Sequence, residues 1–194
     1  MLDFLSAVFY ILHKLAVWKT GVRREGDLDI IEIIKSRRSV RKFTAEPVSE
    51  ELLAKILEAG RWAPSGLNNQ PWRFAVITDA GLRNEISTLT HYSKIVLGAQ
   101  VLIAVFLDTE KSYHREKDIQ AIGACLQNML LEINSLGLGA VWLGEIIKSS
   151  GQIRGLLGLG RELELMAVVA LGHPGEKPRS VRRKALTELV IFRK

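Results

Sequence analysis

A long apolar stretch at residues 118–136, DIQAIGACLQNMLLEINSL, constrains the fold of this chain more than any other feature. At 3.6 residues per turn, its apolar side chains cover much of the circumference of a helix instead of one stripe. A helix of this kind is buried on several sides, so we expect it at the centre of a domain or of a dimer. Gly137 then ends it.

Short runs of β-branched and other apolar residues predict strands before and after that helix. These runs are residues 73–78, 101–107, 140–143 and 163–171, and a last apolar extended piece is expected at 188–193. Further helices are predicted at 28–37, from the N-cap Ser49 to Gly60, and at 80–89. Because helices and strands alternate irregularly, the pattern predicts an α+β domain with a central sheet.

The first 28 residues differ from the rest. Residues 1–18 predict an amphipathic helix whose polar stripe covers only about a third of the circumference, and a polar linker follows. The stretch is shorter than a membrane span and lacks the basic leader of a signal peptide. It either packs against protein, such as a second subunit, or lies in a membrane interface. We therefore divide the chain into an extension at 1–28 and a domain at 29–194.

Composition excludes several function classes. The 194 residues carry a formal charge of +6, but basic and acidic residues are mixed along most of the chain, which disfavours nucleic acid as a partner. The single cysteine, Cys125, allows no intramolecular disulfide, so we expect a reducing compartment such as the cytoplasm. The four histidines show no metal-ligand spacing, and the chain has no P-loop, no Rossmann fingerprint and no serine-hydrolase elbow.

The stretch RRSVRKF at residues 37–43 places four cations within six positions. Like charges this close repel one another, so a compensating partner is expected. Either solvent surrounds the side chains or they bind an anion. A second basic cluster lies at residues 177–184 and could return to the same anion.

Residues 63–74, APSGLNNQPWRF, form the second unusual stretch. Asn68, Asn69 and Gln70 can each donate and accept hydrogen bonds, as the recognition of a flat heterocycle requires. Pro64 and Pro71 reduce the entropy of the loop and would hold these amides ready. The simpler interpretation is a polar loop that closes a helix and enters a strand.

In this order and spacing, the two stretches resemble the nitroreductase family of FMN flavoproteins. The later segments LQNMLLEINSLGLGAVWLGEI and VVALGHPGEKPRSVRRKAL resemble the central helix, the turn beside the flavin and the last core strand with its basic tail. The resemblance covers roughly residues 29–191. It implies a nitroreductase-like α+β fold, with a mixed or antiparallel sheet flanked by helices, in an intertwined homodimer with FMN at the subunit interface.

The resemblance also implies the role of individual residues. Arg37 and Ser39 would hold the FMN phosphate and ribityl chain, with Arg38 supporting them. Arg41 would approach the N1/O2 edge of the flavin ring, where a cation stabilises the reduced form. The remaining predicted flavin contacts are Pro64, Ser65 and Gly66 from the partner subunit, Asn68 and Gln70 at the ring, Val141, Trp142, Leu143 and Gly144 along one face or edge, and Arg182 and Arg183 at the phosphate.

The implied activity is a ping-pong reaction in which NADH or NADPH gives a hydride to flavin N5 and an oxidised acceptor then takes the electrons. Glu145 could influence nicotinamide binding or proton supply, and Tyr113 and His114 could border the substrate pocket. The expected acceptors are flat nitroaromatics, quinones or flavins. Two alternatives stay open, namely a non-catalytic FMN or flavin-binding protein and a membrane-peripheral redox partner.

Overall fold

The computed structural model describes residues 29–178 and 181–194. The predicted extension at residues 1–28 lies outside the described residues. Backbone contacts divide the chain into two units, Met1–Lys35 and Ser36–Lys194. The described part of the first unit contributes most of helix α2 (Ile30–Ser36), which confirms the helix expected there.

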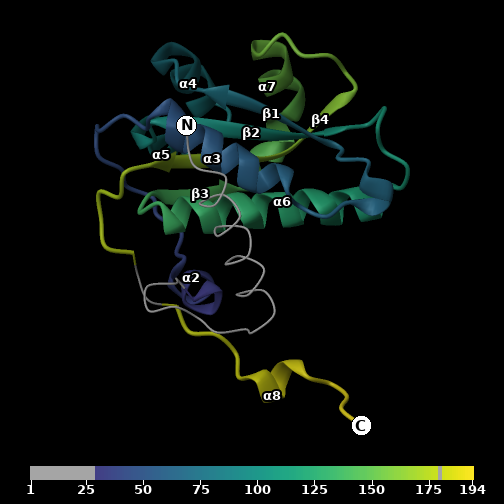
Figure 1. The fold of residues 1–194 in the computed structure, drawn as a ribbon. Helices are drawn as coiled ribbons and strands as arrows, with labels where there is room; N and C mark the ends of the chain where they lie inside the picture. The colour runs from purple at the N-terminus through teal and green to yellow at the C-terminus, as the bar shows by residue number, and fades with distance from the viewer. Residues whose placement is uncertain (1–28, 179–180) are drawn as a thin grey trace, which may run out of the picture. The chain divides into compact units, whose positions relative to one another are not determined.

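The second unit is built on one antiparallel sheet (Figure 1). Its strands are β1 (Trp72–Ile77), β2 (Val101–Asp108), β3 (Gly139–Leu143) and β4 (Leu163–Gly172), in the order β1-β2-β4-β3. Every neighbouring pair is antiparallel, and the register of β2 against β4 shifts between Val105 and Phe106. The predicted α+β domain with a mixed or antiparallel sheet is confirmed, and all of its strand pairs are antiparallel.

Helices cover both faces of the sheet (Figure 1). Helices α3 (Glu50–Arg61) and α6 (Arg115–Ser135) pack on one face, and α4 (Ala80–Ser87), α5 (Ser93–Gly98) and α7 (Ser150–Leu156) pack on the other. Two short 3-10 helices, η1 (Gly66–Asn68) and η2 (Glu145–Ser149), follow α3 and β3. The sequence did not predict α5 and α7, because six or seven residues give too few turns for a periodic signal.

Strand β2 is buried along its whole length, and its side chains alternate between two cores. Val101, Ile103 and Val105 face α3 and α6, whereas Leu102, Ala104 and Phe106 face the helices of the other side. This alternation follows from the two-residue period of a strand. A continuous apolar run therefore fits a strand that is covered on both faces.

Helix α6 buries one stripe of side chains, which runs from Asp118 to Ile133. Within the single chain it is not covered on several sides, since Ile119 remains 36% exposed and Leu131 is only half-buried. The expectation of a helix that is buried on several sides is therefore met only in part within this chain.

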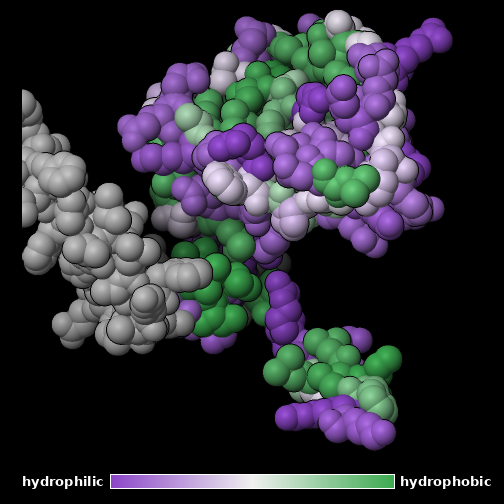
Figure 2. Space-filling view, turned by 45° about the vertical axis from the view of Figure 1, so that its right-hand side comes forward, coloured by the Kyte–Doolittle hydropathy of each residue, from purple (hydrophilic) through white to green (hydrophobic). Residues whose placement is uncertain are grey.

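The C-terminal segment departs from the sequence prediction. No strand forms over residues 188–193; instead Leu186–Leu189 form a short helix, α8. Leu186, Ile191 and Phe192 are 77%, 97% and 78% exposed, and the apolar surface of this segment is visible in Figure 2. A strand needs a neighbouring strand to hydrogen-bond with, and none of the described strands pairs with these residues.

Among the described residues, no helix combines the length and the apolar character that crossing a membrane requires.

The cationic stretch is attached to the edge of the sheet. Val40 N donates to Ala140 O at 2.9 Å, Thr44 N donates to His173 O at 2.9 Å, and Gly175 N donates to Lys42 O at 2.8 Å. The Val40 side chain is buried directly against Gly139, where an added Cβ would lie 2.8 Å from the Val40 Cβ. The absence of a side chain at Gly139 therefore lets the stretch approach the sheet.

We predict that Gly139→Ala lowers the free energy of unfolding by about 1–3 kcal/mol, because the β-branched Val40 cannot rotate its Cβ away. Denaturant unfolding measures this change. The matched control is Gly155→Ala in α7, where an added Cβ meets nothing within 4 Å and should be neutral or slightly stabilising. Equal stability of both variants and the wild type would contradict this packing.

Candidate functional site

A hollow of about 680 Å³ opens beside residues 37–42. Its lining consists largely of cations, and Ser39 and the single carboxylate of Glu176 also belong to it. The basic residues of the lining are Arg37, Arg38, Arg41, Lys42, Lys94, Lys177 and Arg183. The structure thus brings the two basic clusters of the sequence together, although Arg182 is not part of the lining.

Arg37 is a partly buried cation of this hollow with two like charges nearby. Burial lowers the pKa of its guanidinium, and the nearby charges of Arg183 and Arg38 lower it further. No ion pair joins Arg37 to a carboxylate among the described residues, and the Arg38 Nη1 donates to the Arg37 backbone oxygen at 2.9 Å. Lys42 is different, since its side chain is 76% exposed and lies 3.7 Å from Glu176. Because Arg37 has two like charges nearby and no ion pair with a carboxylate among the described residues, the cluster around Arg37 favours a bound anion.

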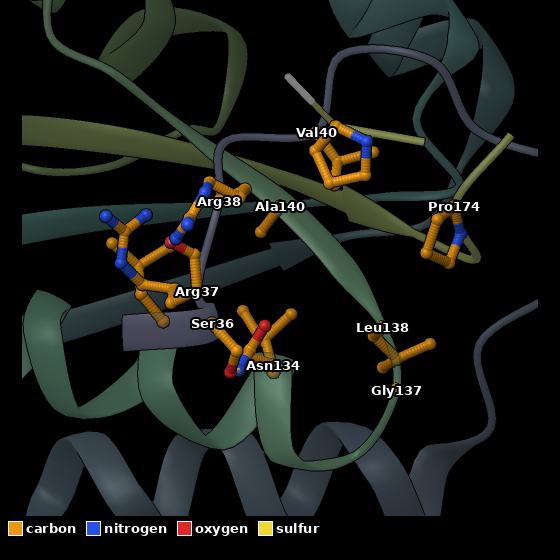
Figure 3. Close-up of a pocket in the computed structure, with 12 residues that line it drawn as sticks. Ser36, Arg37, Arg38, Val40, Asn134, Gly137, Leu138, Ala140 and Pro174 are labelled. Carbon is orange, nitrogen blue, oxygen red and sulfur yellow. Dashed lines mark hydrogen bonds between the residues drawn. The ribbon is translucent and has the colours of Figure 1, made fainter. Parts of the chain in front are cut away.

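Figure 3 shows Ser36, which precedes the arginines, beside Asn134 of α6. A cavity of about 160 Å³ lies between residues 36–40 and the C-terminal end of that helix. Asn134, in the last turn of α6, donates from Nδ2 to Ser36 Oγ at 2.9 Å. This contact fixes the start of the cationic stretch against the helix.

A smaller pocket of about 140 Å³ adjoins the hollow and shares Arg41 and Ile95 with it. It is lined by the predicted turn Val141, Trp142, Leu143 and Gly144, together with Tyr92 and Glu145. The side chains of Val141 and Leu143 are buried in the core, whereas Trp142 is 42% exposed. Any contact of Val141 and Leu143 with a ligand would therefore be made through the backbone.

Glu145 is held in place at this pocket. It accepts a hydrogen bond from Thr90 Oγ1 at 2.7 Å, pairs with Lys148, and lies 3.6 Å from His91 Nε2. The hydrogen bonds from Lys148 and then Thr90 lower the pKa of its carboxyl, which keeps it ionised at neutral pH. Sequence reasoning missed Thr90, His91 and Lys94, because they precede or belong to the unpredicted helix α5.

The amide-rich loop at residues 63–74, called the amide loop below, does not line the hollow or the adjoining pocket. Ser65 Oγ accepts from Gln70 N at 3.0 Å, and Gln70 Nε2 donates to Asn68 O at 3.2 Å. Leu67, Asn68 and Gln70 have positive φ angles of 54°, 54° and 47°, a region that residues other than glycine rarely adopt. Strained backbone of this kind persists where the surroundings hold it, and it is concentrated at functional sites.

Tyr113 borders this loop, and neither Tyr113 nor His114 belongs to the lining of the cationic hollow. A Cβ at Gly66 would lie 1.8 Å from the Tyr113 hydroxyl, so the tyrosine packs directly on the glycine. His114 Nδ1 lies 3.0 Å from Glu116. Pro64 and Asn68 are exposed, as residues that contact a ligand or another chain must be.

The predicted site residues thus form two groups at opposite ends of α6. The arginine group meets the helix at Asn134, and the amide loop meets it at Asp118. Sixteen residues at about 1.5 Å each separate these positions by roughly 24 Å. The two groups of one chain therefore meet α6 at well-separated points.

Comparisons with known proteins point to one family. A profile of the Nitroreductase family matches residues 34–93 and 87–173. A protein of Methanothermobacter thermautotrophicus named NADH dehydrogenase/NAD(P)H nitroreductase is 35% identical over 153 residues, which are 78% of this chain and 80% of that protein.

Two solved structures are similar as well. A protein from Desulfovibrio desulfuricans, described as a nitroreductase in complex with FMN, is 47% identical, with a TM-score of 0.82 over 87% of this chain and 98% of that one. The NADPH:FMN oxidoreductase of Vibrio harveyi, complexed with NAD+, is 29% identical, with a TM-score of 0.77 over 85% of this chain and 77% of that one.

We predict that inorganic phosphate raises the thermal midpoint of the ligand-free protein, because an anion offsets the repulsion around Arg37. Arg37→Gln should remove most of this rise in the thermal midpoint. In phosphate-free buffer its midpoint should equal or exceed that of the wild type, because one of the repelling charges is gone. Arg161→Gln, which lies outside the hollow, is the control and should respond as the wild type does. The same phosphate gain in all three proteins would contradict an anion site at Arg37.

Proposed function

The chain belongs to the nitroreductase family, and we propose that it is an FMN-dependent NAD(P)H oxidoreductase that works as a homodimer. The observation that carries the proposal is the hollow in which Arg37, Arg38 and Arg183 stand together without a neutralising carboxylate at Arg37. The FMN complex of the 47% identical relative and the NAD+ complex of the Vibrio harveyi enzyme support the choice of cofactors.

The chemistry of the hollow fits the phosphate of FMN. Guanidinium groups bind phosphate through paired, charge-assisted hydrogen bonds, and Arg37, Arg38 and Arg183 can supply several. Ser39 lies in the same lining and can donate its hydroxyl. Arg182 would lie near the phosphate only as a supporting charge, since it is exposed and outside the lining.

The flavin ring would lie toward the adjoining pocket. Arg41 belongs to both the hollow and that pocket, so it is the cation that would reach the N1/O2 edge of the ring. The exposed indole of Trp142 and the backbone of Gly144 would border the ring, and Val141 and Leu143 would support it from the core. Glu145, ionised and fixed by Thr90, would lie next to the reacting edge.

A second copy of the chain would complete the site. The amide loop with Pro64, Ser65, Gly66, Asn68 and Gln70 lies roughly 24 Å along α6 from the arginines, so the loop that contacts a given flavin would come from the partner. In a two-fold dimer the same surface is used twice, which gives two equal sites. The exposed apolar residues of α6 and of the C-terminal segment offer a surface for this association.

FMN, when bound, accepts a hydride from NADH or NADPH and passes it to an oxidised acceptor. The tasks of this chain are to bind the phosphate, to place a cation at Arg41 where negative charge develops, and to hold the flavin from two sides. No side chain has to act as a nucleophile. The acceptors that we propose are flat nitroaromatics, quinones or flavins, admitted beside the short connection at residues 109–114 that carries Tyr113 and His114.

The test uses the purified protein in stopped flow. We predict that NADH or NADPH bleaches the visible band of bound FMN and that a quinone restores it. If neither nucleotide bleaches the flavin, the protein is a flavin-binding protein and the reductase proposal is wrong.

The phosphate site has its own test. Arg37→Ala combined with Arg183→Ala should weaken FMN binding about a hundredfold or more, since each lost charge-assisted contact contributes roughly 1.5–3 kcal/mol. Gel filtration followed by a visible spectrum measures the retained flavin, with Arg161→Gln as the control. A double variant that stays yellow would place the phosphate elsewhere.

A further inference from the structure

A buried carboxylate connects the amide loop to the neighbouring connection at residues 109–114. Asp118, in the first turn of α6, is fully buried. Its Oδ2 accepts hydrogen bonds from Ser112 Oγ at 2.7 Å, Tyr113 N at 3.1 Å and His114 N at 3.3 Å. Its Oδ1 accepts from Asn69 Nδ2 at 2.8 Å. One side chain therefore holds both segments.

The orientation of the Asn69 amide is fixed by these contacts. Its Nδ2 donates to Asp118 and also to the Lys111 backbone oxygen at 3.0 Å. A flipped amide would place its oxygen against two acceptors, so only one orientation is stable. Asn69 lies between Asn68 and Gln70, whose φ angles are positive. The hydrogen bonds of Asn69 with Lys111 and Asp118 thus hold the strained backbone of the amide loop in place.

The charge of Asp118 is part of this arrangement. Burial raises the pKa of its carboxyl, but the hydrogen bonds from Ser112, Asn69 and the backbone of residues 113 and 114 lower it, and the net pKa is below the ordinary value. The group is therefore an anion at neutral pH. It acts as a fourfold acceptor and not as a proton donor.

A direct contact reinforces the connection. Tyr113 packs on Gly66 so closely that no side chain fits between them. The packing and the hydrogen-bond network together join residues 109–114 to residues 63–70. A displacement of one segment must move the other, since a buried carboxylate that loses donors is costly.

We propose that Asp118 is a positioning residue that couples the acceptor side of the active site to the FMN-binding loop. The inference rests on the proposed function, in which residues 64–66, 68 and 70 touch the flavin of the partner subunit and Tyr113 and His114 border the acceptor pocket. A change at Ser112, which has no role in flavin contact, is transmitted through Asp118 and Asn69 to the flavin. Acceptor recognition and flavin binding are therefore linked.

The experiment compares Ser112→Ala, Asn69→Ala and their combination in the full-length holoprotein. We expect Ser112→Ala to weaken FMN binding by up to about tenfold, because the lost hydrogen bond to a charged group stabilises the loop conformation that contacts the flavin, and to shift the visible flavin band. The double variant should lose less than the product of the two single losses, because both bonds act through one carboxylate. Lys111→Ala is the control, since only its backbone oxygen joins the network.

Asp118→Asn adds a second measurement. It keeps the size of the side chain but cannot accept all four hydrogen bonds, so FMN binding should weaken at least as much as in Ser112→Ala. The shape of the pH profile of kcat between pH 6 and 9 should not change, because the pKa of Asp118 is lowered from its ordinary acidic value. If Asp118→Asn fails to fold, the variants Asn69→Ala and Ser112→Ala still test the proposal, because both positions are partly exposed.

The coupling is wrong if Ser112→Ala changes only the KM for the acceptor while FMN affinity and the flavin spectrum stay at wild-type values. Additive losses in the double variant would also overturn it. Either result leaves the proposed function intact, because wild-type protein that is bleached by NADH or NADPH still meets that test. A wild type that binds no FMN would instead refute the proposed function.

Discussion

Backbone pairing forces like charges together, and the rest of the site depends on this constraint. The hydrogen bond from Val40 N to Ala140 O, the burial of Val40 against Gly139 and the contact of Ser36 with Asn134 fix the stretch that carries Arg37 and Arg38. Arg183 then lies close enough to lower the pKa of Arg37. The contacts of the fold hold these cations close together in spite of their repulsion. A bound phosphate group would offset part of this repulsion through charge-assisted hydrogen bonds. A flavin with a phosphate tail is the ligand that our proposal assigns to this constraint.

The length of α6 is the reason why our proposal places two chains at each flavin site. The helix packs its buried stripe on the sheet and α3, and it carries the arginine stretch at one end and the amide loop at the other. A rigid helix of 21 residues cannot bend to bring these ends together. Two copies that are related by a two-fold axis can place the end of one helix beside the beginning of the other. The exposed Ile119 and the half-buried Leu131 on α6 agree with this arrangement.

Capping residues and short apolar runs made most of the helices and strands predictable from the sequence. Ser49 is the N-cap of α3 as expected, and the predicted strands lie within one or two residues of β1, β2, β3 and β4. Contacts between distant residues could not be predicted. Asn69 and Asp118 are 49 positions apart, and Thr90 and Glu145 are 55 apart, so no local pattern signals either hydrogen bond. The extended piece expected at residues 188–193 begins as the end of helix α8 and joins no strand, because apolar composition alone does not provide a partner strand.

Subunit complementation tests the central claim, a flavin site shared by two chains, most directly. One variant would carry Arg37→Ala and Arg183→Ala, and the other would carry Asn68→Ala and Gln70→Ala. Each should be inactive alone. After the two are mixed, unfolded and refolded together, half of the dimers are mixed and hold one native site each, so about a quarter of the wild-type FMN content and activity should return. No recovery, with mixed dimers present on native mass spectrometry, would contradict a site that is built from both subunits.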